Sequence, residues 1–123
     1  MPSRRLILAL FTFFLLSATS AIAQSDRGAL NGRVTDPTGA AVSNAKVTAT
    51  NLNSGESREV QTSDDGNYTI PELKADPYKV TAEAPGFKTA SAENIVVAVQ
   101  MNRTLDFKLE IGEISGVVTI SND

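Results

Sequence analysis

The sequence contains no cysteine and no histidine. Without cysteine the chain has no disulfides, no thiolate metal ligands and no thiol nucleophile or redox switch. Without histidine it has neither a Ser-His-Asp nor a Cys-His site, because histidine is the usual general base of both. The fold must therefore be stabilised by packing, and catalysis of these types is excluded.

Long apolar runs are also scarce, and the one that is present lies near the N-terminus. It extends from Leu6 to Leu16, follows Arg4 and Arg5, and is short against the roughly 20 residues of a membrane span. A small-x-small cleavage pattern follows, with Ala21, Ala23 and Gln24. These features predict a signal peptide over residues 1–23 rather than a membrane anchor. Without cysteine, a lipid-modified cysteine cannot tether the mature chain.

Basic residues are few in the expected mature chain, residues 24–123. Once Arg4 and Arg5 are removed, nine basic residues remain against 14 acidic ones, so the net charge is about −5. The basic residues are scattered among the acidic ones. Because nucleic acids and anionic membranes bind clustered basic faces, neither is an expected partner. A chain of this length fits one domain.

Aromatic residues are rare as well. After the signal peptide the sequence has only Tyr68, Tyr78, Phe87 and Phe107, and strand phase or local motif assigns each to the core. Carbohydrate-binding sandwiches stack sugars on exposed aromatic faces. Carbohydrate binding is the alternative function for such a sandwich. Because the four rings are assigned to the core, we favour core packing as their role.

What the sequence does contain is short runs of alternating apolar and polar residues, separated by Gly, Pro, Asp and Asn turns. No stretch of the mature chain has apolar residues at helical spacing. The pattern predicts an all-β fold, a seven-stranded antiparallel sandwich of the prealbumin-like or immunoglobulin-like kind. The expected strands cover about 29–35, 45–50, 57–62, 68–70, 78–84, 95–101 and 105–109. Residues 24–28 are expected to form a flexible lead.

Three details of these strands are specific enough to test. The polar run Ser57 to Thr62 has one apolar residue and is expected at a sheet edge. Asp65-Gly66 predicts a tight hairpin, and Asn102-Arg103 predicts another. Residues 111–123 are expected to form a loosely paired or unpaired tail, with an extra strand or a linker to a further domain as alternatives.

The strand alternation also predicts which way particular side chains point. Val99 and Met101 are expected in the core, since they continue the alternation of the run that begins at Ile95. Tyr78 is expected to bury its ring at a corner and to return its hydroxyl group to upstream backbone. Lys46 lies between inward-facing neighbours and should point outward, which disfavours an intramolecular lysine-asparagine bond.

Acidic residues in the loops raise the question of a metal or catalytic site. Asp36, Asp64, Asp65 and Asp76 all lie in expected turns. Their spacing does not match an EF-hand loop, and adjacent carboxylates at a turn tip lack the walls of a glycosidase cleft. Since Asp beside Gly or Pro is ordinary turn composition, we expect no metal, no cofactor and no catalytic residue here.

Five motifs follow one another along the chain: Gly32-x-Val34-x-Asp36-x-x-Gly39, Ala45-x-Val47, Asp65-Gly66-x-Tyr68, Leu73 through Tyr78, and Gly86-Phe87. This order resembles the carboxypeptidase regulatory-like domain over about Gly28 to Glu110. The resemblance implies a seven-stranded prealbumin-like sandwich without catalytic residues. It gives structural roles to ten positions: Gly32, Asp36, Gly39, Asp65, Gly66, Tyr68, Leu73, Tyr78, Gly86 and Phe87. One departure is Asp76-Pro77, where the family usually has Gly two residues before the tyrosine. A residue that precedes proline favours extended geometry, which puts the local turn in doubt.

Within the family, the sequence is most similar to the N-terminal domain of Oar-like TonB-dependent outer-membrane receptors. This resemblance implies an exported, non-catalytic accessory module at the cell envelope, in the periplasm, the outer membrane or outside the cell. We do not expect transport by this chain alone. The expected partner is a protein, bound by strand addition at Ser57 to Thr62 or at Val117 to Ile120.

Overall fold

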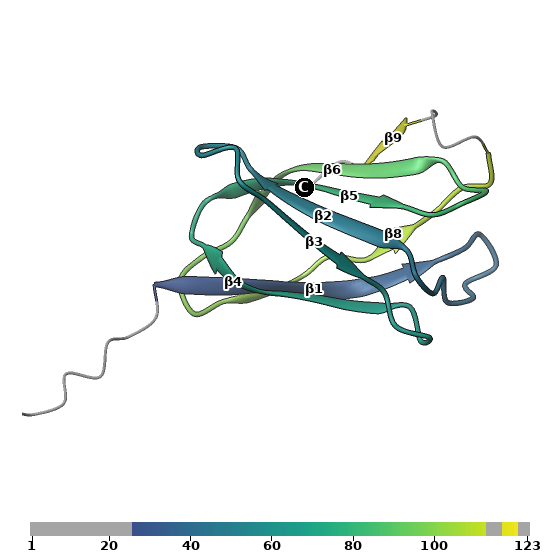
Figure 1. Ribbon diagram of the computed structural model, residues 1–123, viewed down its shortest axis with the longest axis horizontal. Coiled ribbons are helices and arrows are strands. Elements are labelled where there is room, and N and C mark those ends of the chain that lie inside the picture. Colours follow the sequence, from purple (N-terminus) through teal and green to yellow (C-terminus); the bar gives the residue numbers. More distant parts are fainter. Residues whose placement is uncertain (1–25, 113–116, 121–123) are drawn as a thin grey trace, which may run out of the picture.

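The computed structural model describes residues 26–112 and 117–120, and all regular elements in these ranges are strands. They form two layers that face each other (Figure 1). One sheet has the order β4-β1-β7, with β8 also paired to β1, and the other has the order β3-β2-β5-β6-β9. The bounds are β1 (Arg27–Thr35), β2 (Lys46–Asn51), β3 (Ser57–Gln61), β4 (Asn67–Lys74), β5 (Pro77–Glu83), β6 (Thr89–Val96), β7 (Asn102–Thr104), β8 (Phe107–Lys108) and β9 (Val117–Ile120).

The core lies between the sheets and is built by the expected alternation. In β2 and β5 every second side chain is buried, whereas the residues between them reach the outer face. The largest fully buried side chains come from both sheets: Phe107, Leu30, Ile70, Ile95 and Leu109. Burying each of them stabilises the fold by about 1.5–3 kcal/mol. The prediction of an all-β sandwich is confirmed.

The strand number and the pairing differ from the prediction. β7 and β8 pair with successive parts of β1 and occupy one position, so the described residues hold eight strand positions rather than seven. The additional position belongs to β9, beyond the expected domain. The sandwich is also not purely antiparallel, because β1 pairs with β7 and β8, and β6 with β9, in parallel.

Asp65-Gly66 forms a turn, but the expected hairpin is wrong. Gly66 has a φ of 77° and donates its N–H to the carbonyl of Ser63 at 2.9 Å. The strands on either side, β3 and β4, lie in different sheets. The buried hydroxyl of Thr62 accepts from the Ala45 N–H at 2.9 Å and donates to the Val42 carbonyl at 2.6 Å, so Thr62 is fixed beside the start of β2 just before the turn.

The region after β6 also differs from the prediction. Val99 and Met101 are 54% and 41% exposed, because the chain turns at residues 98–101 instead of continuing the strand. Asn102-Arg103 is part of β7 and not a hairpin loop. β7 runs parallel to β1, and a tight hairpin cannot produce a parallel neighbour.

The tail contains an extra strand. β9 pairs with β6 in parallel, with Val117 opposite Thr89 and Ile120 opposite Ala92. Residues 117–120 are therefore not unpaired, and they form the extra strand expected as the alternative. The expected signal peptide and its cleavage residues Ala21, Ala23 and Gln24 lie outside the described residues.

The corner before β5 has the predicted tyrosine contact. The hydroxyl of Tyr78 donates to the Lys74 carbonyl at 2.9 Å, and its ring is buried. Pro77 begins β5, and the nearest upstream residue with left-handed geometry is Glu72 within β4, with a φ of 57°, rather than Asp76. The strand after the doubtful turn is thus preserved, and the left-handed geometry lies four residues earlier.

Replacing Tyr78 with phenylalanine tests how much this contact contributes. The variant keeps the buried ring and loses the hydrogen bond to the Lys74 carbonyl together with the longer one, 3.4 Å, that the hydroxyl accepts from the Asn51 side chain. Because the Asn51 amide keeps its bond to Asp76, the free energy of unfolding should fall by about 1–2 kcal/mol. Urea unfolding followed by circular dichroism measures the change. An unchanged midpoint would show that water replaces the hydroxyl at no cost.

Candidate functional site

The acidic residues of the loops are spread over both ends of the sandwich. Asp36 follows β1, whereas Asp76 precedes β5 at the opposite end, since Arg33 pairs with Asn67 and Arg27 with Lys74 along β1 and β4. Within the described residues, no three His, Cys, Asp or Glu side chains are grouped so that they could hold a metal ion. The structure does not bring these carboxylates together.

Two of the carboxylates are held by their own loops. Asp36 accepts from the Thr38 hydroxyl at 2.6 Å and from the N–H groups of Thr38 and Ala40, which holds the pKa of Asp36 below its ordinary value. Asp76 accepts from the side-chain amides of Asn51 at 3.0 Å and Asn53 at 2.8 Å, and these bonds lower its pKa in the same way. Both carboxylates therefore fix turns.

The aromatic side chains belong to the core. Tyr68, Tyr78 and Phe107 are buried, and Phe87 is half-buried against the core. The rings of Tyr68 and Phe107 lie 6.4 Å apart at 43°, and burial raises the pKa of both tyrosines. The described part of the chain thus has no exposed aromatic platform on which a sugar could stack.

The other residues that the sequence singles out lie in turns and in the core. Gly39, Gly66 and Gly86 have positive φ, and Leu73 is buried. Gly32 lies in β1 against the backbone of Leu105, and the Tyr68 hydroxyl donates to the carbonyl of the same Leu105. These residues are not brought together into one site.

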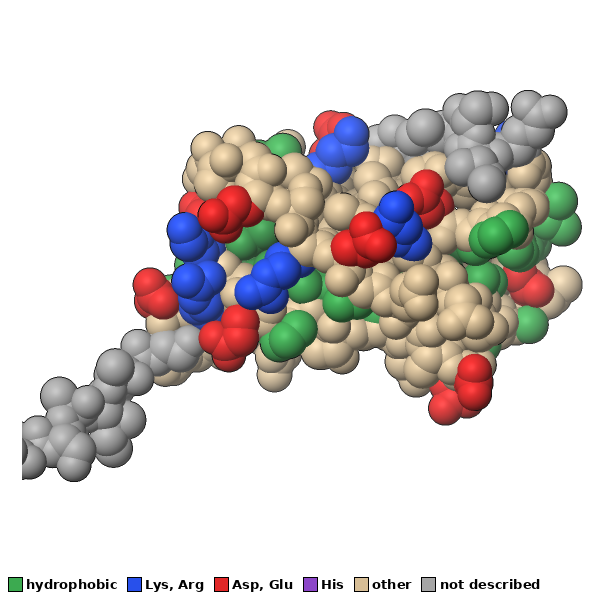
Figure 2. Space-filling view, in the orientation of Figure 1, with side chains coloured by type: hydrophobic (Ala, Val, Ile, Leu, Met, Phe, Trp, Pro, Cys, Tyr) green, Lys and Arg blue, Asp and Glu red, His purple; other side chains and the backbone are tan. Residues whose placement is uncertain are grey.

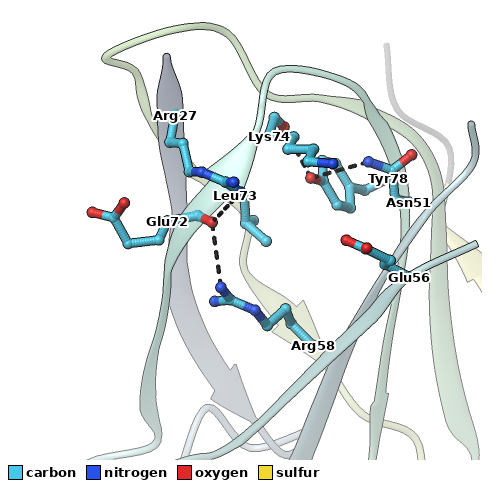
Figure 3. A pocket seen from close by; sticks show the side chains of 8 residues that line it. All are labelled: Arg27, Asn51, Glu56, Arg58, Glu72, Leu73, Lys74 and Tyr78. Carbon is cyan, nitrogen blue, oxygen red and sulfur yellow. Dashed lines mark hydrogen bonds between the residues drawn. The ribbon is translucent and has the colours of Figure 1, made fainter. Parts of the chain in front are cut away.

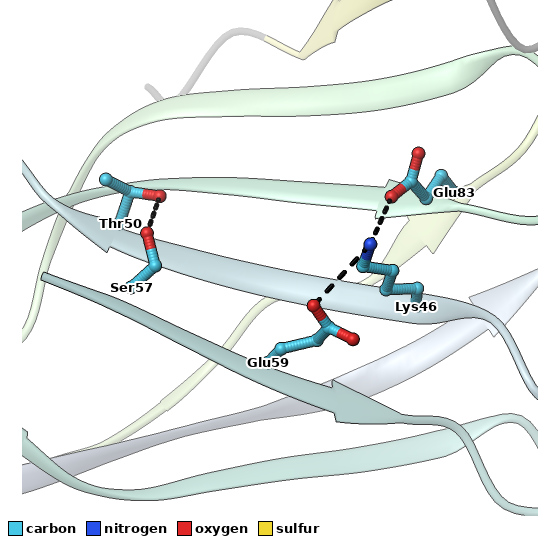
Figure 4. Close-up of polar contacts among 5 residues, drawn as sticks. All are labelled: Lys46, Thr50, Ser57, Glu59 and Glu83. Carbon is cyan, nitrogen blue, oxygen red and sulfur yellow. Dashed lines mark hydrogen bonds and ion pairs between the residues drawn. The ribbon is translucent and has the colours of Figure 1, made fainter.

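The outer face of β2 and its neighbours is polar. Lys46 forms ion pairs with Glu59 on β3 at 3.5 Å and with Glu83 on β5 at 3.3 Å, and Thr50 bonds Ser57 at 3.0 Å (Figure 4). The hydrogen bond to Glu83 and the charge of Glu59 raise the pKa of Lys46. Lys46 therefore points outward, as the strand phase predicts, and does not reach a buried asparagine.

β3 is an edge strand, as its polar sequence predicts. The amide of Thr62 donates to Ala45, and the amide of Asn51 donates to the Glu56 carbonyl, so even-numbered residues of this strand bond β2. Antiparallel pairing alternates, and the N–H groups of Ser57, Glu59 and Gln61 therefore point away from β2. The edge offers main-chain donors to a further strand.

A small cavity opens where β3 approaches β4, at the end of the sandwich where β1 begins (Figure 3). Arg58 donates to the carbonyls of Pro71 at 2.9 Å and Glu72 at 3.4 Å, and Arg27 donates to the Glu72 carbonyl at 3.3 Å. The left-handed conformation of Glu72 presents this carbonyl to both guanidinium groups. The hydrogen bonds of Arg58 thereby link β3 to β4 across the open side of the sandwich.

The cavity carries an excess of positive charge. Arg27, Arg58 and Lys74 line it together with Glu56, whereas the carboxylate of Glu72 points away from it (Figure 3). Figure 2 shows several Lys and Arg side chains of this face near the end where the described chain begins, while others lie at the middle and the upper edge of the face beside acidic side chains. The cavity is thus a locally basic part of a chain that is acidic overall.

Sequence reasoning did not find this cavity. One signal was available, because Arg58 lies two residues before Val60 and so faces the same side of β3. The left-handed backbone at Glu72 has no counterpart in the sequence, since glutamate is not a residue that favours positive φ.

Solved structures share this architecture. They include a candidate carbohydrate-binding protein from Bacteroides uniformis (20% identity, TM-score 0.54, 66% of this chain and 40% of that chain). Also similar are catechol 1,2-dioxygenase from an Acinetobacter species (12%, 0.56, 80% and 60%) and a cohesin-X-dockerin complex from Acetivibrio cellulolyticus (14%, 0.57, 72% and 60%). The chain spans 40% to 60% of the length of these three chains. At such identities the likeness shows the fold alone.

The family of the chain is shown by its sequence. No curated protein matches the sequence. In the described part of the chain there is no helix with the length and apolar character needed to cross a membrane. The sequence model of the carboxypeptidase regulatory-like domain matches residues 29–110, which is more than half of the chain and extends from the start of the core in β1 to the residues after β8. This match and the two-layered all-β fold show that the chain belongs to the carboxypeptidase regulatory-like domain family, whose fold is non-catalytic.

Proposed function

We propose that this chain is an exported, non-catalytic accessory module that binds a protein partner at the cell envelope through the free edge of β3. The observation that carries the proposal is the row of outward main-chain donors at Ser57, Glu59 and Gln61. An edge strand pairs with an added strand through its main chain, without a catalytic or cofactor site. The resemblance of the fold to a cohesin-X-dockerin complex supports a role in protein binding.

Export is supported by the sequence. Arg4 and Arg5, the apolar run and the small residues Ala21 and Ala23 form the pattern of a cleaved signal peptide, with Gln24 as the first mature residue. We place the module in the periplasm, at the outer membrane or outside the cell.

β3 and β9, the Val117 to Ile120 segment, are the two outer strands of the same sheet, and we assign the partner to β3 because its outward main-chain donors follow from its pairing with β2. β3 also has a feature that disfavours non-specific pairing with the edge strands of other molecules. Arg58 faces the gap between the sheets and is held on β4, and an inward-facing charge on an edge strand suppresses edge-to-edge aggregation. The edge is therefore suited to a specific partner rather than to self-association.

Replacing Glu59 with proline should block the added strand. The Glu59 N–H faces outward, so proline removes a donor to the partner while the bonds of β3 to β2 persist. With a photo-crosslinking residue at Gln61 in the producing cells, we expect one defined adduct. Glu59→Pro should reduce its yield by about tenfold or more, the effect of one or two lost main-chain bonds plus steric exclusion.

Glu59→Ala is the matched control for this experiment. It removes the same ion pair with Lys46 but keeps the outward N–H, so the adduct should persist. Equal loss in both variants would assign binding to the Glu59 carboxylate and not to the edge. An adduct that survives proline would overturn docking at β3.

Carbohydrate binding is the competing function, and the Bacteroides uniformis neighbour is described as a candidate for it. Two observations oppose it here. The aromatic rings are buried or packed against the core, and the cavity beside β3 has a volume of about 30 Å³, which is too small for a sugar ring. A larger cavity of about 190 Å³ beside Lys46 and Glu83 has no aromatic side chain in its lining. Retention of a glycan on an array by the purified chain would favour the competing function.

We further propose that the module is the front part of a TonB-dependent receptor-like protein. The support is the resemblance of residues 28–110 to the N-terminal domain of the Oar-like receptors. The gene sequence downstream of the Asp123 codon tests this proposal, since a plug and barrel encoded in frame are required.

A further inference from the structure

Arg58, beside the cavity at β3, has more N–H donors than its hydrogen bonds within the fold occupy. Arg58 carries five N–H groups, and its hydrogen bonds to Pro71 and Glu72 both go to neutral carbonyl oxygens. Arg58 is exposed, so further N–H groups of the guanidinium remain open to a ligand. The bonds to β4 hold the planar group in place, which lowers the entropy that a ligand must overcome.

The opposite wall of the cavity is formed by Glu56, directly after the β2–β3 turn. Its main chain is bonded, with the N–H donating to the Ser54 hydroxyl and the carbonyl accepting from Asn51. Its carboxylate points into the cavity towards Arg58, whereas the carboxylate of Glu72 points outward (Figure 3). Three cationic residues and two glutamates line the cavity, so its charge balance is positive even when the outward-pointing Glu72 is counted.

We propose that this cavity binds a carboxylate group from an acidic side chain of the partner segment that lies along β3, an inference that rests on the proposed function. The size of the cavity is compatible with this ligand. A volume of about 30 Å³ holds a carboxylate or about two water molecules. Arg58 recognises it because a guanidinium and a carboxylate can form two parallel hydrogen bonds.

The position of Arg58 connects the cavity to the docking edge. Arg58 lies on β3 between Ser57 and Glu59, whose main-chain donors face outward. A strand added there passes the mouth of the cavity, and a glutamate or aspartate at the matching position reaches Arg58. The module would thus prefer an extended segment with a negative charge at one position.

Acetate is the probe that tests the cavity without the partner. In ¹⁵N–¹H spectra of the chain from Gln24 to Asp123 at constant ionic strength, acetate should shift the Arg58 Nε–Hε signal saturably, and acetamide should not. Arg58→Gln, with folding checked by circular dichroism, should weaken acetate binding by about tenfold or more, as followed at the Lys74 and Glu56 amides.

Glu56→Gln separates ligand recognition by Arg58 from a purely structural role, because a purely structural role predicts no change in the affinity for acetate. No side-chain bond of Glu56 is disturbed by it, and it removes a competing charge a few ångströms from the ligand. Acetate should therefore bind about three- to fivefold more tightly. Lys79→Gln, a change of an exposed cation on the outer face of β5, should leave binding unchanged. No saturable shift at Arg58, or equal effects of Glu56→Gln and Lys79→Gln, would overturn the proposal.

A pair of peptides separates this inference from docking at the edge. An extended pentapeptide with valines flanking a central glutamate should bind about tenfold more tightly than the same peptide with glutamine, and Glu59→Pro should weaken both. Equal binding of the two peptides would reject the carboxylate site and leave edge docking intact. Glutamate-selective binding that survives Glu59→Pro would support the site and reject the edge.

Discussion

Replacing Gly32 with alanine should lower the free energy of unfolding by about 3–5 kcal/mol, a large part of the 5–15 kcal/mol of a typical domain. A Cβ at this position would overlap the carbonyl oxygen of Leu105 and lie 2.6 Å from its carbonyl carbon. It would also lie 2.9 Å from the ring of Tyr68. Urea unfolding monitored by circular dichroism measures the loss.

The magnitude follows from the fixed position of Leu105. Its N–H donates to the Asn31 carbonyl at 2.7 Å, and its own carbonyl accepts from the hydroxyl of Tyr68. The backbone at Leu105 cannot retreat from a new Cβ without breaking one of these bonds. Overlap with backbone is therefore not relieved by a side-chain rotation, which is the usual escape in overpacked cores.

Gly39→Ala provides the comparison. Gly39 has a φ of 87°, and an added Cβ would meet nothing within 4 Å, so only the cost of the left-handed conformation remains. That cost is about 1–2 kcal/mol. A loss at Gly32 no larger than the loss at Gly39 would show that β1 and the Leu105 segment can separate, and that the tight contact is dispensable.

The core could be predicted from the sequence because it depends on local alternation. Val47, Ala49, Val80 and Ala82 are fully buried, and each lies in a run where every second residue is apolar. The edge position of β3 followed from the same reasoning, since a strand with one apolar residue has little to bury. Core burial and the edge position of β3 both depend on residues that are neighbours in the sequence.

The order of the strands could not be predicted in this way. The turn at Asp65-Gly66 looks the same whether the next strand pairs with the last one or crosses to the other sheet. The exposure of Val99 and Met101 has the same origin, because the alternation of their run continues through the turn where the chain leaves β6. Strand order is decided by contacts between distant segments, as in the parallel pairs of β1 with β7 and β8.

The candidate site was less predictable than the core. The edge of β3 was foreseen, whereas the cavity depends on Arg27, Arg58 and Lys74, which come from three different strands. The acceptor that brings two of them together is a backbone carbonyl of Glu72, and a backbone carbonyl has no residue type by which a sequence pattern could reveal it.

Replacing Phe107 with alanine should lower the free energy of unfolding by about 3–5 kcal/mol. Phe107 is the largest fully buried side chain, at 1% exposure, and its ring packs near that of Tyr68 at 6.4 Å. It lies in β8, which has two residues and pairs with β1 opposite Val34. So short a strand has few main-chain bonds, and we infer that the buried ring is what fixes it on β1.

This inference distinguishes Phe107→Ala from an ordinary cavity variant. Loss of the ring should release β8 before the rest of the sandwich unfolds, so the amides of Phe107 and Leu109 should lose hydrogen-exchange protection more than that of Val80 in β5. Ile111→Ala, at a side chain that is 75% exposed, should change stability by less than about 0.5 kcal/mol. A stability loss below about 1.5 kcal/mol with uniform protection would show that β8 is held by its backbone, because the ring would then contribute less than any fully buried aromatic side chain should.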